Sequence, residues 1–329
     1  MKCINKKFIQ LLCLLCITVV LLGGCANTAP PYDNAYEVYS YENSFINNME
    51  QNSSIDYFAK ELCVTENVDF GTDKTDSQVA KGAGVFNTTT KEVLYSQNLF
   101  GKLYPASTTK ILTAYIILKY ADLNSVVTVS ASAADQAEDS SVCGLKAGDN
   151  ITVRDLLYGL MLKSGNDAAE ALAEHYSGSL EAFAEVMNYE ASLLGATSSH
   201  FMNPSGLSHE NHYTTIYDMY LIFNEALKLP SFRNIINTVS HTCTYSSISG
   251  ATIEKTFWNS NRYLNKTVKT PDGFEVLGGK TGTTYDAGYC LVLHSQNTKG
   301  DDIISIVFKA DGRSNLYLLM NQILSRFAN

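Results

Sequence analysis

The chain has 329 residues and a formal net charge of −9, with 45 % hydrophobic and 17 % charged residues. This balance is typical of a globular protein, and the length allows one large domain or two small ones. Nucleic-acid-binding proteins usually carry a basic surface, so the acidic balance argues against a nucleic-acid partner.

Residues 1–25 have the layout of a secretory signal. A basic start precedes an almost wholly apolar stretch over residues 8–22, which is followed by Gly23, Gly24 and Cys25. A spanning helix needs about 20 apolar residues, so this stretch is short for one. The cysteine after two glycines resembles the lipobox of bacterial lipoproteins, whose cysteine takes a diacylglyceryl group and becomes the new N-terminus. We predict a lipoprotein signal peptide over residues 1–24 and lipidation of Cys25, with an uncleaved membrane anchor as the alternative.

Both interpretations place the rest of the chain on the outer side of the cytoplasmic membrane. Residues 25–60 lack clear periodicity and contain Pro30 and Pro31 near their start, which disfavours a helix or a strand there. We predict a lipid-anchored flexible tether with a root-mean-square span of roughly 30–35 Å. The alternative is that the part after Ser53 packs onto the following domain.

Four cysteines lie in the body of the chain, at Cys63, Cys143, Cys243 and Cys290. They are isolated and show no ligand-like spacing to histidine, so we predict neither a metal nor another cofactor. One or two disulfides outside the cell, or four small buried hydrophobic residues, are both compatible with this pattern. His209 and His212 could be a metal pair, but their spacing in a loop is more typical of polar surface.

Strands at both ends of the domain enclose a helical middle. Residues 108–120 are apolar enough for a buried central helix. This pattern favours an α+β sandwich in which the terminal strands and a final helix form one layer. The predicted elements are strands over 79–86 and 92–95, a helix over 108–120, a strand over 126–129, helices over 153–163, 168–176, 180–194 and 217–227, strands over 276–277, 288–294 and 303–308 around turns at Gly282 and Gly300, and a helix over 316–327.

The first of three short motifs is Ser107-Thr108-Thr109-Lys110, at the start of the most apolar helix. Residues three apart on a helix share a face, so Lys110 can reach the Ser107 hydroxyl. The helix start also offers free N–H groups for an oxyanion. Apolar neighbours disfavour the ammonium form of Lys110 and make it usable as a base. The alternative is a capping serine beside a surface lysine.

The second motif is Ser164-Gly165-Asn166, between two predicted helices, and the third is Lys280-Thr281-Gly282, after a predicted strand. Ser164 and Asn166 would alone be read as caps of the next helix. Lys280 to Gly282 would alone be a simple turn, although glycine also lets a backbone approach a ligand closely.

In this order, the motifs resemble those of the serine penicillin-recognising enzymes. The surrounding segments narrow the resemblance to the D-Ala-D-Ala carboxypeptidase family of low-molecular-mass penicillin-binding proteins, from about Gly82 to Ala310. The segments that carry it are 105–110, 162–168, 200–207 with 213–219, and 279–283 with 287–289.

The resemblance implies a β-lactamase/transpeptidase-like sandwich over residues 61–329, with an antiparallel sheet and a helical cluster. It implies Ser107 as nucleophile, Lys110 as its base, Ser164 as proton relay and Asn166 as the group that positions the peptide. In the third motif it implies that Lys280 and Thr281 hold the substrate carboxylate, that Gly282 allows close approach, and that the N–H groups of Thr283 and Ser107 form the oxyanion hole. Arg313 and Arg326 are both candidates for an arginine that assists carboxylate binding.

The implied substrate is a peptidoglycan pentapeptide ending in D-Ala-D-Ala, with β-lactams as inhibitors and no cofactor. Many family members also carry a β-rich second domain and a C-terminal amphipathic anchor, which we expect the N-terminal lipid to replace. The glutamate of a class A β-lactamase is not found between the second and third motifs. An endopeptidase or transpeptidase of the same fold, or a non-catalytic wall-peptide-binding lipoprotein, are the alternatives.

Overall fold

The computed structural model describes residues 59–328, so the signal peptide, Cys25 and almost all of the predicted tether lie outside the described residues. Its largest sheet is antiparallel, with the strand order β2-β1-β9-β8-β7. Strands from the two ends of the domain meet in its middle, where β1 pairs with β9. This confirms the predicted layer of terminal strands. The five strands are β1 (Gly82–Asn87), β2 (Glu92–Gln97), β7 (Phe274–Thr284), β8 (Gly288–Asn297) and β9 (Asp302–Ala310).

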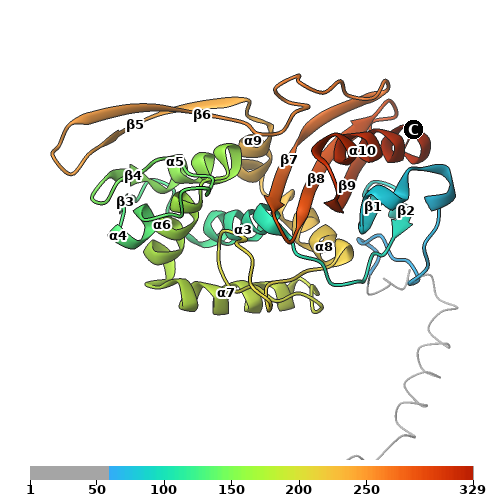
Figure 1. The fold of residues 1–329 in the computed structure, drawn as a ribbon, viewed down its shortest axis with the longest axis horizontal. Coiled ribbons are helices and arrows are strands. Elements are labelled where there is room, and N and C mark those ends of the chain that lie inside the picture. The colour runs from blue at the N-terminus through green and yellow to red at the C-terminus, as the bar shows by residue number, and fades with distance from the viewer. Residues whose placement is uncertain (1–58, 329) are drawn as a thin grey trace, which may run out of the picture. The chain divides into compact units, whose positions relative to one another are not determined.

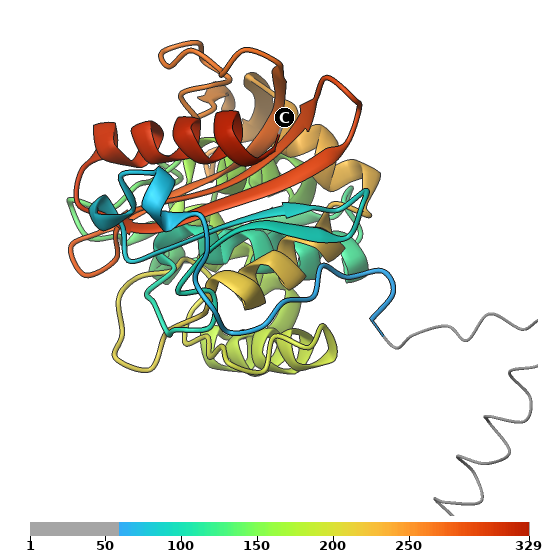
Figure 2. The ribbon, with the colours of Figure 1, turned by 90° about the vertical axis from the view of Figure 1, so that its right-hand side faces the viewer.

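Both faces of this sheet are covered. Helix α10 (Arg313–Phe327) lies on one face and the other α-helices lie on the opposite face (Figure 2). Successive side chains of a strand point to opposite faces, so Ile304 and Ile306 of β9 join the core under the helices, whereas Ile303 and Val307 join the core under α10. The sheet is therefore the middle layer of an α+β sandwich, as predicted.

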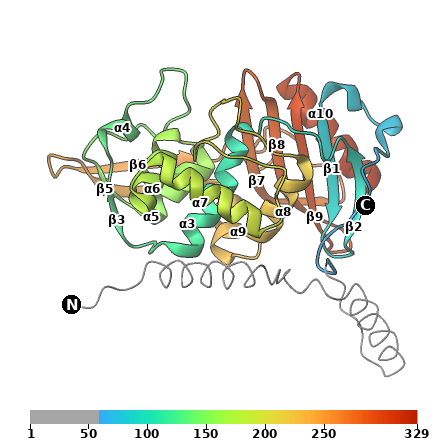
Figure 3. The ribbon, with the colours of Figure 1, turned by 90° about the horizontal axis from the view of Figure 1, so that it is seen from below.

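Helix α3 (Lys110–Tyr120) runs through the centre of the helical layer, and eight of its eleven residues are buried. Figure 3 shows α6, α7 and α8 around it, with α8 beside the sheet. Thr152, Ser179 and Thr215 begin α5, α7 and α8, because each side-chain oxygen accepts a first-turn N–H. The other helices are α4 (Ala131–Ala134), α5 (Val153–Tyr158), α6 (Asn166–Ser177), α7 (Leu180–Leu193), α8 (Ile216–Ala226) and α9 (Pro230–Asn237).

A second sheet, of order β3-β4-β5-β6, borders the helical layer. Its long hairpin of β5 and β6 extends over the helices (Figure 1) and was not predicted from the sequence. The strands are β3 (Val126–Thr128), β4 (Asn150–Thr152), β5 (Ser240–Ser246) and β6 (Thr252–Trp258). Among residues 59–328, no helix has both the length and the apolar character to cross a membrane.

Three local predictions need correction. The helix predicted from 108 begins as a 3-10 turn over Ala106–Thr109, and the one predicted over 153–163 is α-helical only to Tyr158 and ends as a π-turn over Gly159–Lys163. The predicted turn at Gly282 is wrong, because β7 continues to Thr284. Of the two alternatives for the cysteines, burial is what the structure shows: all four in the described part of the chain are buried and free.

Candidate active site

The nucleophile segment is a tight turn against which a distant segment of the chain packs. Ser107 lies in the 3-10 turn that leads into α3, and Ala106 before it has a φ of 48°, which is uncommon for a residue with a side chain. Gly206, with a φ of 86°, packs directly against this turn, since a Cβ there would lie 1.9 Å from the Ala106 carbonyl oxygen. The segment that includes Gly206 therefore fixes the position of Ser107.

Lys110 is fully buried and surrounded by acceptors. Its Nζ lies 2.8 Å from Asn166 Oδ1, 2.6 Å from the Ser205 carbonyl oxygen and 3.0 Å from Ser107 Oγ. Burial lowers the pKa of Lys110 to about 7, while nearby Cys143, Asp167 and Glu170 act in the opposite direction. The two carbonyl oxygens can only accept. In the neutral amine they take the two N–H groups, so the lone pair remains for the Ser107 hydroxyl.

The second motif adds a further serine–lysine pair. Ser164 ends the π-turn in a left-handed conformation, with a φ of 66°, and its Oγ accepts a hydrogen bond of 2.8 Å from Lys280 Nζ. Irregular turns of this kind often occur at functional sites. Asn166 begins α6, so its side chain reaches Lys110 from the start of a helix. Both side chains thus contact the lysines, and neither caps α6, whose N-cap residue is Gly165.

Asp167 has a role that the sequence reasoning missed. Its carboxylate accepts N–H groups from Cys143, Gly144 and Leu145 at 2.8, 2.8 and 3.0 Å. In addition, the Asn166 N–H donates to the Ser141 carbonyl at 2.8 Å. These bonds tie the loop around residue 141 to the second motif. The sequence shows only that an acidic residue follows Asn166. It does not indicate the partners of Asp167, because they are backbone N–H groups, which nearly every residue type carries.

The third motif lies on β7, the edge strand that faces the nucleophile turn. A Cβ at Gly282 would lie 3.0 Å from the backbone nitrogens of Ser107 and Thr108, so glycine serves close packing here. Lys280 is only 1 % exposed, and burial, together with the neighbouring charge of Lys110, lowers its pKa well below the usual range. Its Nζ also donates to the Thr281 carbonyl at 2.7 Å. The structure thus brings all three motifs to one place.

Two cavities meet at Thr283. The first, of about 240 Å³, is the cleft over the nucleophile and is lined by Ser107, Asn166 and Thr283, by the loop segment 139–141, and by residues 205–208 and 284–285. The second, of about 120 Å³, includes Thr281, Thr283, Ser260 and Arg313. Ser260 Oγ lies 2.9 Å from Thr281 Oγ1. Of the two candidate arginines, only Arg313 lines either cavity, and neither cavity is lined by Lys280.

His212 is buried behind the nucleophile turn. One ring nitrogen lies 2.9 Å from Thr109 Oγ1 and the other accepts the Met202 N–H at 3.1 Å. Burial lowers the pKa of His212 to about 4, so the ring is neutral near pH 7. Both nitrogens are occupied, which leaves no pair with His209 to bind a metal.

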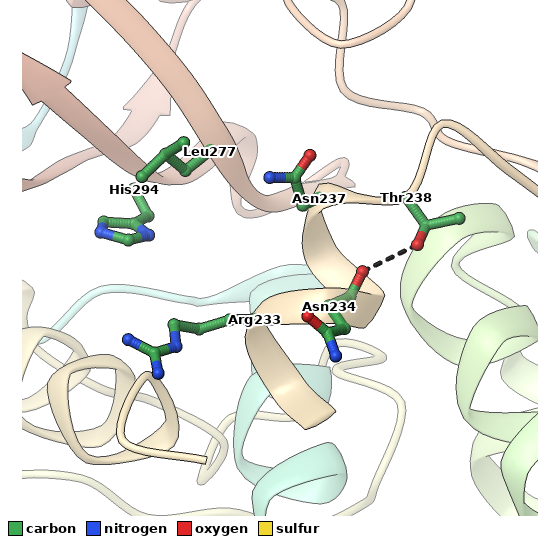
Figure 4. Close-up of a pocket in the computed structure, with 6 residues that line it drawn as sticks. All are labelled: Arg233, Asn234, Asn237, Thr238, Leu277 and His294. Carbon is green, nitrogen blue, oxygen red and sulfur yellow. Dashed lines mark hydrogen bonds between the residues drawn. The ribbon is translucent and has the colours of Figure 1, made fainter. Parts of the chain in front are cut away.

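A third cavity, of about 400 Å³, lies between α9 and the strands β7 and β8 (Figure 4). It is lined by Arg233, Asn234, Asn237, Thr238, Leu277 and His294. None of the predicted site residues lines it, so it is separate from the cleft over Ser107.

Comparison with known proteins shows which family has this arrangement. The profile of the family described as D-alanyl-D-alanine carboxypeptidase matches residues 70–312. The chain belongs to this family. It is 37 % identical over 237 residues to the D-alanyl-D-alanine carboxypeptidase DacF of Bacillus subtilis. The aligned region covers 70 % of this chain and 57 % of DacF. It is 34 % identical over 224 residues to a D-alanyl-D-alanine carboxypeptidase of Streptomyces strain K15, covering 65 % of this chain and 75 % of that protein.

A solved structure of a serine-to-alanine mutant of the Streptomyces K15 DD-transpeptidase is similar to this one. The TM-score is 0.70 at 31 % identity, over 75 % of this chain and 96 % of that chain. The family and this likeness confirm the predicted β-lactamase/transpeptidase-like fold. The chain spans only a little over half of the length of the DacF protein, 57 %.

Proposed function

We propose that the protein is a serine-type D-Ala-D-Ala carboxypeptidase. It would remove the terminal D-alanine of peptidoglycan stem peptides through an acyl-enzyme, and β-lactams would acylate the same serine. The observation that carries this proposal is the Lys110 amine, which is buried, has a pKa lowered to about 7 and lies 3.0 Å from Ser107 Oγ. Membership of the family supports the choice of substrate.

In acylation, Ser107 Oγ would attack the carbonyl between the two D-alanines while its proton passes to Lys110. A base with a pKa near the working pH is efficient in such a transfer. The oxyanion would lie between the backbone N–H groups of Ser107 and Thr283, both of which belong to residues that line the cleft. Asn166 uses Oδ1 for Lys110, so its NH₂ group would be available to hold a carbonyl of the peptide.

The leaving amine needs a proton when the peptide bond breaks. The Ser164 hydroxyl would give it one and would regain a proton from Lys280, which lies 2.8 Å away. Water would then attack the acyl-enzyme and release the shortened peptide. In residues 59–328, Asp139 carries the one carboxylate that lines the cleft, and no carboxylate is hydrogen-bonded to Ser107, Lys110 or Ser164. Fast hydrolysis of a β-lactam acyl-enzyme is therefore not expected.

The terminal carboxylate would bind in the smaller cavity. Thr281 and Ser260 offer hydroxyl groups and Arg313 offers a permanent cation. Lys280 would contribute from behind Thr281, because a carboxylate nearby would favour its charged form. A cation and hydroxyl groups beside the scissile bond would bind substrates with a free C-terminal carboxylate more tightly than others. This preference favours an exopeptidase over an endopeptidase.

The location is also part of the proposal. Members of a family that acts on the cell wall work outside the cytoplasm, and we propose that a lipid on Cys25 holds this one at the outer face of the cytoplasmic membrane. Residues between Cys25 and the domain would serve as a tether to the wall peptides.

The test uses three substrates with the purified domain, residues 56–329. A pentapeptide ending in D-Ala-D-Ala should release one D-alanine, with little transfer to an added amine, and the same peptide with an amidated C-terminus should not be cleaved. A fluorescent penicillin should label the wild type and fail to label Ser107→Ala. Equal cleavage of the amidated peptide would indicate an endopeptidase, and dominant transfer to the amine would indicate a transpeptidase. Rapid turnover of penicillin would indicate a β-lactamase, and no turnover at all a binding protein.

A further inference from the structure

A fourth cavity, of about 310 Å³, lies beside the active-site cleft and has no part in the mechanism above. It is lined by Lys102, Leu103, Tyr104, Glu210, Tyr213 and Lys309. Two lysines and one glutamate give it a net positive charge, and two tyrosines give it an aromatic wall. We propose that this cavity is a subsite for a carboxylate on the acyl arm of the peptide, the part upstream of the D-alanine that acylates Ser107. This inference rests on the proposed function.

The direction of the bound peptide follows from the two cavities that meet at Thr283. The terminal carboxylate belongs at the end with Thr281, Ser260 and Arg313. The acyl arm must then run the other way along β7, past Thr283 toward Tyr285. Its path therefore leads to the end of the cleft where Ser208 Oγ donates to Thr284 Oγ1 at 3.1 Å.

The lysine-lined cavity and that end of the cleft share a bordering loop. The loop over residues 207–213 borders both spaces, since Ser208 lines the cleft and Glu210 and Tyr213 line the cavity. The nucleophile segment also borders both, because Tyr104 is three residues from Ser107. Three residues span at most about 11 Å, and an extended peptide advances about 3.3 Å per residue. The residue two positions before the acylating D-alanine lies about 7 Å away from it in an extended chain, and its side chain would cover the remaining distance to the cavity.

The two lysines are placed by specific features. Lys102 Nζ lies 4.0 Å from the centre of the Tyr213 ring, a cation–π contact that holds the side chain over the cavity. Lys309 has a φ of 54°, in the left-handed region. It belongs to a bulge in β9, where the pairing shifts between Tyr289, opposite Ala310, and Leu291, opposite Val307. Bulges of this kind often redirect a side chain near an active site, and here the redirected side chain lines the cavity.

The ligand chemistry follows from these charges. Lys102 and Lys309 are exposed and would pair with a carboxylate in partial contact with water, so the gain is modest. The negative charge of Glu210 would repel an anion, so removal of that charge should strengthen binding of the carboxylate, whereas removal of the lysines should weaken it. An exposed ion pair of this type changes binding by less than about fivefold, so two lysines together give a preference of about three- to tenfold.

The experiment compares two pentapeptides that both end in D-Ala-D-Ala. In one, the residue two positions before the acylating D-alanine has a free carboxylate, and in the other that carboxylate is an amide. The ratio of their kcat/KM values should be about three to ten in the wild type and about one in Lys102→Ala/Lys309→Ala. Glu210→Gln should increase the ratio, and salt should decrease it.

The matched control is Lys228→Ala/Arg233→Ala, which removes two positive charges elsewhere, Arg233 from the cavity of Figure 4. It should keep the ratio of the wild type. An N-acetylated D-Ala-D-Ala, which lacks the upstream residues, should be cleaved equally by all these variants. A ratio near one in the wild type, or a ratio that survives loss of both lysines, overturns the subsite.

A second readout separates this proposal from the carboxypeptidase proposal. Fluorescently labelled forms of the two peptides are titrated against Ser107→Ala and against Ser107→Ala/Lys102→Ala/Lys309→Ala, with binding followed by polarisation. Preference for the carboxylate form that disappears with the lysines supports the subsite even if no peptide is cleaved. Equal binding of both peptides by Ser107→Ala refutes it even if the enzyme is active.

Discussion

Replacement of Asn166 by aspartate tests whether Lys110 is the base. Asn166 Oδ1 lies 2.8 Å from Lys110 Nζ, and aspartate has the same shape but adds a negative charge at that point. The added charge stabilises the ammonium form of Lys110, so its pKa must rise. The neutral fraction at a given pH then falls, and acylation of Ser107 slows with it.

The magnitude follows from the starting value. With a pKa of about 7, roughly half of Lys110 is neutral at pH 7. An opposite charge in contact moves a pKa by about 1–3 units. A rise of about one unit lowers the neutral fraction at pH 7 about fivefold, and a rise of about three units lowers it about 500-fold. Because a carboxyl group buried at this position can itself take up a proton, the lower part of this range is the expectation.

The assay is the second-order rate of acylation by a fluorescent penicillin, measured from about pH 5 to about pH 10, a range that spans the expected shift. In the wild type the rate should rise with pH through a midpoint near 7, as Lys110 loses its proton. In Asn166→Asp the midpoint should move to alkaline pH, with much of the rate recovered there. Asn166→Ala is the control, since it removes the same contact without adding charge and should show no alkaline shift. An Asn166→Asp profile with the midpoint of the wild type would refute Lys110 as the base.

Three further predictions concern the lipid anchor, the binding of the substrate carboxylate, and the hydrogen bonds by which Asp167 holds the loop around residue 141. Cys25→Ala should release the protein from membranes or leave an unprocessed precursor, as seen by fractionation, and normal processing with membrane retention would exclude lipidation. Arg313→Leu should raise KM for a D-Ala-D-Ala peptide about 10- to 100-fold, since a charge-assisted hydrogen bond contributes about 1.5–3 kcal/mol, and an unchanged KM would remove Arg313 from the carboxylate site. Asp167→Asn should lower the free energy of unfolding in urea by about 1–3 kcal/mol, because the N–H groups of residues 143–145 lose an anionic acceptor. An unchanged midpoint of the urea transition would show that these hydrogen bonds do not stabilise the loop.

The parts of the fold that the sequence predicts are those with strong apolar patterning. Helix α3 is apolar around most of its surface and is buried around most of its surface. The hairpin of β5 and β6 was missed because its strands are rich in threonine and only Cys243, Tyr245 and Phe257 of their residues are buried. A pattern so weakly apolar does not differ from that of a loop.

Within the site, the motifs predict which residues meet but not how each is held. Gly282 was read as a turn because glycine is common in turns, whereas here it is required by close contact with the Ser107 backbone nitrogen, on a segment far away in the sequence. The acceptors that make Lys110 a base include the Ser205 carbonyl oxygen, a group that every residue type carries. The sequence does not distinguish Arg313 from Arg326 as the carboxylate-binding arginine. The structure does, because Arg313 at the start of α10 lines the same cavity as Thr281.

The two buried lysines suggest how one site moves a proton twice without a carboxylate. The charge of Lys110 is among the causes that lower the pKa of Lys280, so a proton on one lysine disfavours a proton on the other. The bound substrate carboxylate would keep Lys280 protonated until Ser107 gives its proton to Lys110, and the new charge on Lys110 would then push Lys280 to release its proton. Lys280 Nζ donates to Ser164 Oγ at 2.8 Å, so the released proton would pass to that hydroxyl and from it to the leaving amine. Uptake of the Ser107 proton by Lys110 would then drive delivery of a proton through Ser164 to the leaving amine. The acyl-enzyme would form without any further acid or base.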